Sequence, residues 1–285
     1  MSLSPRSVLK LGLETMRRSA RVMEELTPIE EARASWRELQ NKLEAFICFS
    51  YPDQFCGPGL DPYRRLWTTE GIGYMRAECA VRERRPEEAL LPLHTGMGLA
   101  FACRAMKAPA PVADRICIFL ELCDKYALRD YHGACYEALG LVARNLHPES
   151  VSQCEQNLGG RLREYFWHGV GRGIYFIPTN LLPQMSAPWR SAQMAASEPS
   201  DEIGRLNAIA GLVWAVTLVN IRNPEILELF QRHHGARLPE AAYRDGVGCA
   251  MRVWQHAISG AAVGEGASPG EWFRFGNDHY GCAKY

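Results

Sequence analysis

The sequence predicts an all-α protein in which repeated α-hairpins pack as a compact α/α array or toroid. Apolar residues recur at the i, i+3, i+4 spacing of an amphipathic helix along most of the chain. Runs of Val, Ile and Thr with clean alternation, which would indicate strands, are nearly absent. Similar glycine-containing segments also recur at intervals of 36 to 39 residues after a first interval of 24, and the longer intervals match a helical hairpin.

Composition narrows the classes of function. With 285 residues, 47% of them hydrophobic, the chain is expected to form a single domain (1–285) with a large core. Lys+Arg and Asp+Glu number 32 each, so no basic excess points to nucleic acid. The ten cysteines form no CxxC pair, which favours a reducing cytoplasm. The longest apolar run, 206–221, is too short and too polar for a membrane span and predicts a buried core helix.

The expected elements follow in chain order. Residues 1–65 hold N-terminal helices, including one over 35–49, and a Pro/Gly loop, YPDQFCGPGLDP. Residues 66–259 hold the helical repeats. Within them, helical spacing predicts helices over 86–106, 113–126, 130–146, 150–176, 206–221, 225–233 and 238–259.

Two segments are expected not to be helical. Four prolines between 178 and 199 predict an irregular Pro-rich loop or lid over 178–205. Residues 260–285 combine six glycines with aromatic residues and predict a coil held by aromatic anchors.

The glycines of YFWHGVGRGIYF (165–176) do not fit a nucleotide site. A dinucleotide fingerprint needs a third glycine after a strand, and that position is occupied here by Ile174. The chain also lacks a GxxxxGK[ST] loop, so no nucleotide cofactor is expected. Because residues i and i+2 of a helix point to nearly opposite sides, Gly-x-Gly would instead let two neighbouring helices approach closely. A strand with alternating small and large residues is the alternative.

Each repeated segment opens with a polar residue, and a second set of residues follows one helical turn later. If the units are equivalent, these side chains face one concave wall. The candidate catalytic residues are Glu70, His94, His132, His168 and Arg172, and the candidate substrate-binding residues are Tyr74, Tyr136 and Asp245. The alternative is that these polar residues, with Asn207, are helix caps or satisfied core hydrogen-bond partners.

Other catalytic patterns are missing from the sequence. It contains no HExxH, no GxSxG elbow and no ExxH pair of the di-iron type. Glu70, Glu137 and the three motif histidines could hold a metal only if the fold brought them together, so no metal and no other cofactor is predicted.

The ordered segments EGIGYMRAE, HTGMGLAFACR, YHGACYEALG, HGVGRGIYFI and IAGLVWAV resemble those of a bacterial family encoded beside the polyketide synthase in enediyne biosynthetic gene clusters (UnbL-like). The similarity covers roughly residues 60 to 255, is looser at 210–212 and excludes 178–205. The resemblance implies a role in assembling or handling a reactive polyene or enediyne-type product, with the polyketide synthase as a further partner. It implies no particular reaction.

Two functions are consistent with these observations. In the first, a His/Glu/Tyr/Arg wall performs acid–base chemistry on a hydrophobic polyketide-derived molecule, as imidazole and carboxyl groups can near neutral pH. In the second, the protein is a scaffold or carrier without catalytic activity, which shelters such a molecule or docks on the synthase. The convergence of ionisable groups favours the first.

Overall fold

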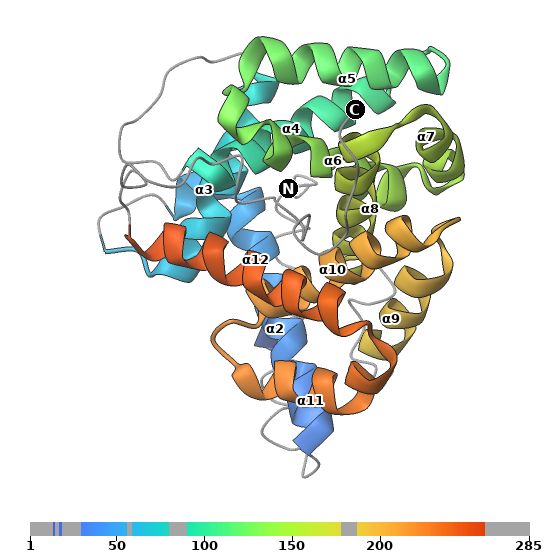
Figure 1. Ribbon diagram of the computed structural model, residues 1–285. Helices are drawn as coiled ribbons and strands as arrows, with labels where there is room; N and C mark the ends of the chain where they lie inside the picture. The colour runs from blue at the N-terminus through green and yellow to red at the C-terminus, as the bar shows by residue number, and fades with distance from the viewer. Residues whose placement is uncertain are drawn as a thin grey trace, which may run out of the picture.

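All regular structure in the described part of the chain is helical (Figure 1). The computed structural model describes residues 30–55, 59–79, 90–177 and 187–259, together with residues 14, 17 and 18. Over these ranges no strand occurs, so the all-α prediction is confirmed and the strand interpretation of the glycine segments is wrong. The predicted tail, 260–285, lies outside the described residues, as do most of the first 29 residues.

Eleven α-helices and four short 3-10 helices make up the regular structure of the described residues between 30 and 259. The α-helices are α2 (Glu30–Ser50), α3 (Pro62–Glu78), α4 (Leu90–Met106), α5 (Val112–Tyr126), α6 (His132–Leu146), α7 (Val151–Asn157), α8 (Gly160–Tyr175), α9 (Ala187–Ser197), α10 (Glu202–Val219), α11 (Pro224–His234) and α12 (Glu240–Ser259). Short 3-10 helices are η1 (Pro52–Gln54), η2 (Arg129–Tyr131), η3 (Pro148–Ser150) and η5 (Gly235–Arg237).

Six of these, α3, α4, α6, α8, α10 and α12, are called the inner helices below. Each packs extensively on the next one in this order, and α12 also contacts α3 and α4. Helices α5, α7 and α9 alternate with them along the chain and flank them, whereas α2 packs on α3 and α11 packs on α2 (Figure 1). A continuous apolar core extends through the inner helices, from Leu66 in α3 to Ala257 in α12.

Glycines set the close spacing of the inner helices, as predicted. A Cβ atom on Gly169 would lie 1.8 Å from the carbonyl oxygen of Glu137 in α6, whereas one on Gly171 would lie 1.9 Å from that of Ala208 in α10. The two glycines of one Gly-x-Gly therefore face two different neighbouring helices. The same division between two neighbours occurs at Gly71 and Gly73 of α3 and at Gly96 and Gly98 of α4.

The segment 150–176, expected as one helix, is divided into α7 and α8. The chain leaves α7 at Asn157, and α8 begins at Gly160, whose φ is +53°. Glycine adopts this left-handed conformation without the steric cost that a side chain would add. The break lets α8 start in a new direction.

The expectation of an irregular loop over 178–205 is also wrong in part. Helix α9 occupies Ala187–Ser197, and α10 already begins at Glu202. Pro188 lies in the first turn of α9, where a missing backbone N–H costs nothing because the first N–H groups of a helix have no intrahelical partner. Residues 178–186 lie outside the described residues, so the structure describes no lid there.

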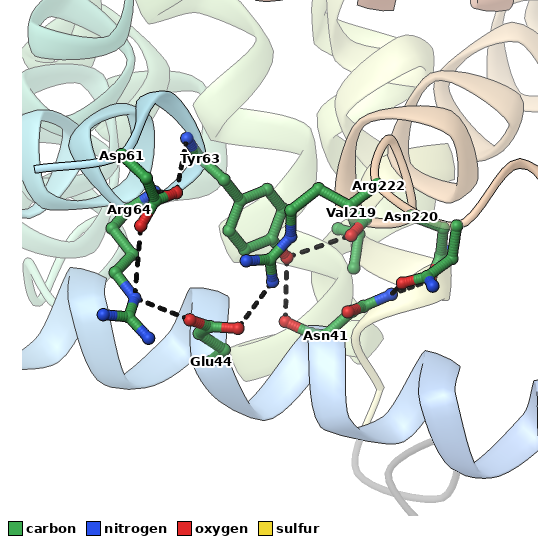
Figure 2. A network of polar contacts seen from close by, with 9 residues as sticks. Asn41, Glu44, Asp61, Tyr63, Arg64, Val219, Asn220 and Arg222 are labelled. Atoms are coloured by element: carbon green, nitrogen blue, oxygen red, sulfur yellow. Dashed lines mark hydrogen bonds and ion pairs between the residues drawn. The ribbon is translucent and has the colours of Figure 1, made fainter.

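A polar network joins α2, α3 and the end of α10 (Figure 2). The Tyr63 hydroxyl lies 2.9 Å from the carbonyl oxygens of both Asn41 and Val219, so these two acceptors share its single proton. The Arg222 guanidinium lies over the Tyr63 ring, 3.8 Å from its centroid, and also donates to Glu44. Long-range contacts of this kind fix α2 against the inner helices.

Helix α10 is the core helix that the apolar run predicted. Its length and hydropathy would also suit a membrane span, but 78% of that window is buried inside the protein. It is the one helix of this kind in the described residues. Asp201 caps its N-terminus by accepting a hydrogen bond from the backbone N–H of Gly204 at 2.8 Å.

Candidate functional site

Four ionisable side chains from three inner helices meet in the core. Glu70 comes from α3, Glu137 from α6, and His168 and Arg172 from α8; their side chains are 8%, 2%, 0% and 3% exposed. Arg172 Nη1 donates to Glu137 Oε2 at 3.0 Å, and Arg172 Nη2 lies 3.7 Å from Glu70 Oε1. His168 Nδ1 lies 3.1 Å from Glu137 Oε1. The four are called the buried cluster below.

Local structure and glycine packing together position the buried cluster. His168 and Arg172 are four residues apart, so they share one face of α8. Three backbone carbonyls of the buried cluster lie directly against a glycine of a neighbouring inner helix, so close that a Cβ atom on the glycine would collide with the oxygen. The pairs are Glu70 with Gly96, Glu137 with Gly169, and His168 with Gly211. The glycines thus bring the backbones that carry the ionisable side chains close together.

The Trp214 ring of α10 forms one wall of the site. The Arg172 guanidinium carbon lies 4.1 Å from the centroid of this ring, and the His168 ring meets it edge-on at 6.4 Å. A cation over an indole face is stabilised by the ring quadrupole, more strongly where water is excluded. With one face of the guanidinium against Trp214, its polar contacts are made through its edges.

Burial acts differently on the two carboxyl groups. Burial alone would raise the pKa of Glu137, but His168 and Arg172 together hold that pKa below its usual value, so Glu137 is ionised at neutral pH. Burial raises the pKa of Glu70 to about 7, with Arg172 opposing the rise and Glu137 adding to it. Glu70 is therefore the carboxyl group that can gain or lose a proton near neutral pH.

A small cavity adjoins the buried cluster and accommodates a group about the size of one water molecule. All six inner helices contribute to its wall. The lining residues are Leu66 and Glu70 of α3, Leu91, Pro92 and Thr95 of α4, Glu137 of α6, Arg172 of α8, Trp214 and Leu218 of α10, and Val253 of α12. One side is ionisable and most of the remainder is apolar.

His94 lies elsewhere, in contact with the connection between α5 and α6. Its Nε2 accepts a hydrogen bond from the backbone N–H of Leu128 at 3.2 Å, and its ring stacks on Tyr131 at 4.8 Å. Its backbone carbonyl accepts a hydrogen bond from Cys135 Sγ at 3.1 Å. These contacts match the core hydrogen-bond alternative and not a place in the buried cluster.

The remaining candidates belong to separate local groups. The Tyr136 hydroxyl lies 3.1 Å from His132 Nδ1, which is 3.6 Å from Asp124 Oδ1. Tyr74 donates to Glu78 Oε1 at 3.2 Å, and Asp245 is half-buried on α12. The described residues that line the cavity do not include His132, Tyr136, Tyr74 or Asp245. The expected single wall of eight side chains is therefore not formed.

The capping alternative is wrong for the residues inside helices. Glu70 and His168 lie in the middle of α3 and α8, and the N-caps of α3 and α10 are Asp61 and Asp201. Asn207, also inside α10, donates from its side chain to the carbonyl oxygen of Ile203 at 2.9 Å, as expected of a satisfied core residue.

Sequence reasoning gave Glu137 only as a conditional metal ligand and did not place it among the candidate catalytic or substrate-binding residues. A signal was available, because a carboxylate within the apolar run of 132–143 needs a buried counter-charge, and Arg172 lies in a similarly apolar run. Within the described residues no group of three or more His, Cys, Asp or Glu side chains is arranged to hold a metal ion. In the buried cluster the cation between the two carboxyl groups is Arg172.

Comparison of the chain with protein-family models, with curated proteins and with solved structures finds no match. The site therefore has to be interpreted from its own geometry.

Proposed function

We propose that the protein acts on a hydrophobic, polyene-derived small molecule of polyketide type, with acid–base chemistry at the buried cluster. The observation that carries the proposal is the placement of Glu70, Glu137 and Arg172 in the wall of one cavity whose other walls are mostly apolar. Sites for small molecules combine apolar walls with a few convergent polar groups, and shifted pKa values are common in them. The substrate class itself comes from the resemblance to the enediyne-cluster family.

The roles of the residues follow from their charge states. Glu70 is the general acid or base, since its proton equilibrates near neutral pH. Arg172 stabilises negative charge that develops on the substrate, in a site from which water is largely excluded. Glu137 holds Arg172 and His168 in place through its two oxygens. The other candidate residues take no direct part in the proposed chemistry, because they lie outside the buried cluster. They are His94, His132, Tyr74, Tyr136 and Asp245.

The packing order of the inner helices supports the finer description of the fold as an α/α array that closes on itself. Consecutive inner helices pack side by side, and α12 returns to α3 and α4. In such an arrangement the inner faces converge on one axis, where a cavity lined by all six helices would lie. A cytoplasmic location beside a polyketide synthase completes the proposal.

A carrier without catalytic activity is the second candidate function, and the apolar part of the wall favours it. Leu66, Leu91, Leu218 and Val253 would suit contact with an apolar molecule that is held and not converted, once the water-sized cavity opens to admit it. In that case Glu70 and Arg172 would fix only the orientation of the bound molecule.

Incubation of the purified protein with a panel of conjugated polyenes tests the proposal. Conversion, seen as a change in mass together with absorbance, supports the enzyme; a shifted spectrum with unchanged mass supports the carrier. Glu70→Gln should abolish conversion, whereas the matched control Glu198→Gln, which alters a carboxylate paired with Arg144 outside the cavity, should not. If no polyene is bound or converted, both candidate functions are wrong.

A further inference from the structure

The Arg172 guanidinium carries an N–H group in the buried cluster, at Nε, that no described residue satisfies. Nη1 is used by Glu137, one face is covered by Trp214, and Nε is buried with no hydrogen-bond partner among the described residues. Arg172 lines the cavity. A buried N–H group of this kind is costly unless an acceptor meets it.

Glu70 provides a second group for a ligand. Within the described residues its carboxyl group has one polar contact, with Arg172 Nη2 at 3.7 Å, which is longer than a hydrogen bond. It lines the same cavity as Arg172. While it holds its proton, Glu70 can donate a hydrogen bond from its O–H.

The charge of the wall selects among possible acceptors. Among the described residues, two carboxyl groups, those of Glu70 and Glu137, line the cavity beside one guanidinium, that of Arg172. A carboxylate ligand would bring a third acidic group into this space and compete with Glu137 for the same cation. A neutral oxygen with free lone pairs meets both donors without that repulsion.

We infer that the Glu70 and Arg172 side of the cavity receives the oxygen of a neutral carbonyl group, an aldehyde or ketone carried by an apolar conjugated chain. This inference rests on the proposed function and deepens it by naming the functional group of the ligand. The cavity accommodates the carbonyl oxygen itself. The adjoining carbons would have to displace the apolar side chains of Leu66, Leu91, Leu218 and Val253, which line it and would then contact the chain.

The inference predicts that binding weakens as pH rises through neutrality. Glu70 donates only while protonated, and its pKa of about 7 is set by burial first, then by Arg172 of α8 and Glu137 of α6. Within the described part of the chain, the other inner helices place no titratable side chain in the cavity wall. Their contributions there are Leu91, Pro92 and Thr95 of α4, Trp214 and Leu218 of α10, and Val253 of α12.

Three matched probes test the inference: a linear conjugated trienone, the trienoic acid of the same length and the triene hydrocarbon. Equilibrium dialysis against the full-length protein should give the trienone an affinity about tenfold or more above that of the hydrocarbon, the gain expected from hydrogen bonds to a charged donor. The absorption band of the bound trienone should move to longer wavelength, because donors polarise its carbonyl oxygen.

Variants at Glu70 separate donation from packing. Glu70→Gln keeps a donor and should bind the trienone without the loss of affinity at raised pH, whereas Glu70→Leu should reduce the preference for the trienone over the hydrocarbon. Glu198→Gln should behave as the parent. If Glu70→Leu does not fold, the pH profiles of the parent and Glu70→Gln still decide the question.

Equal affinity for the trienone and the hydrocarbon, or tighter binding of the trienoic acid, would overturn the carbonyl inference and leave the proposed function standing. Failure of all three probes to bind would overturn both.

Discussion

Replacing Glu70 with glutamine should stabilise the protein relative to the parent by an amount that increases with pH. The free energy of unfolding of the variant minus that of the parent should therefore be larger at alkaline pH than at acidic pH. The folded-state pKa of Glu70 is raised from 4.5 to about 7, so the folded protein loses stability as pH rises from about 4.5 to about 7. Each pKa unit corresponds to about 1.4 kcal/mol. The ionisation of Glu70 therefore lowers the free energy of unfolding by about 1 kcal/mol at about pH 5.5 and by about 3 kcal/mol at about pH 8. Glutamine carries no charge at either pH and avoids this cost.

Urea unfolding of the parent and Glu70→Gln at these two pH values measures the effect. The free energy of unfolding of the variant, relative to the parent, should increase by about 2 kcal/mol from the acidic to the alkaline condition. A constant offset, caused by any lost packing, cancels in this difference. Glu137 does not contribute to the difference, because its pKa is lowered and it stays ionised in both proteins over this window.

The control is Glu198→Gln, since Glu198 pairs with Arg144 away from the cavity and its side chain is 25% exposed. Its stability should follow that of the parent across the window. Parallel profiles for the parent and Glu70→Gln would refute the reasoning, because they would mean that Glu70 titrates in the folded protein as it does in the unfolded chain.

Three further predictions concern stability, each measured by urea or thermal unfolding. Gly171→Ala should destabilise the protein by about 1–3 kcal/mol, because the new Cβ would lie 1.9 Å from a backbone carbonyl oxygen of α10; Gly248→Ala, whose Cβ would meet nothing closer than 3.8 Å, should be neutral or stabilise by up to about 1 kcal/mol. Glu137→Gln should cost about 3–5 kcal/mol, since it removes the negative partner of a buried guanidinium. His94→Ala should cost about 1–3 kcal/mol by leaving a backbone N–H unpaired, while polyene binding by the folded protein persists. Equal changes in stability at the two glycines would contradict the first expectation, and an unchanged stability of Glu137→Gln would contradict the second. The third would be contradicted if His94→Ala lost polyene binding without losing stability.

The helical class and the packing of the glycines could be predicted because both depend on local spacing. Opposite directions of residues i and i+2 are a property of any helix, and Gly169 and Gly171 face α6 and α10 as that property requires. The exception is Gly248, which faces no neighbouring helix. Of the two glycines of the Gly-x-Gly in α12, Gly246 alone faces α10, where a Cβ would lie 2.5 Å from the carbonyl oxygen of Ala210.

Helix boundaries were less predictable, because the repeated polar residues look like helix starts. Helices α3 and α10 in fact begin upstream of their repeated polar residues, and their true caps are Asp61 and Asp201. Of the inner helices described, only α6 begins at its repeated polar residue, His132. Pro188 was taken as a helix breaker, although in the first turn of α9 it is compatible with helix. Such cases depend on where the helix starts, which the neighbouring residues alone do not settle.

The site shows the same division between local and long-range information. His168 and Arg172 could be paired from the sequence because they lie four residues apart on one helix. Their pairing with Glu137, and the approach of Arg172 to Glu70, span three helices and depend on which glycines meet which carbonyls. His94 occupies an equivalent position in its repeat, yet its ring meets the backbone at Leu128, so equivalent positions do not have equivalent surroundings.

The energetics of the buried cluster favour a functional explanation over a structural one. Buried ion pairs contribute little to stability when compared with apolar residues of similar volume, because the cost of removing charges from water offsets their attraction. Glu70 illustrates the point, since its raised pKa means that its ionised form destabilises the fold despite the nearby guanidinium of Arg172. A leucine at position 70 would carry no charge and avoid that cost, and Leu66 and Leu218 line the same cavity. A carboxyl group whose proton equilibrates near neutral pH, placed in the wall of a cavity, is what acid–base chemistry or ligand recognition requires and what stability alone does not.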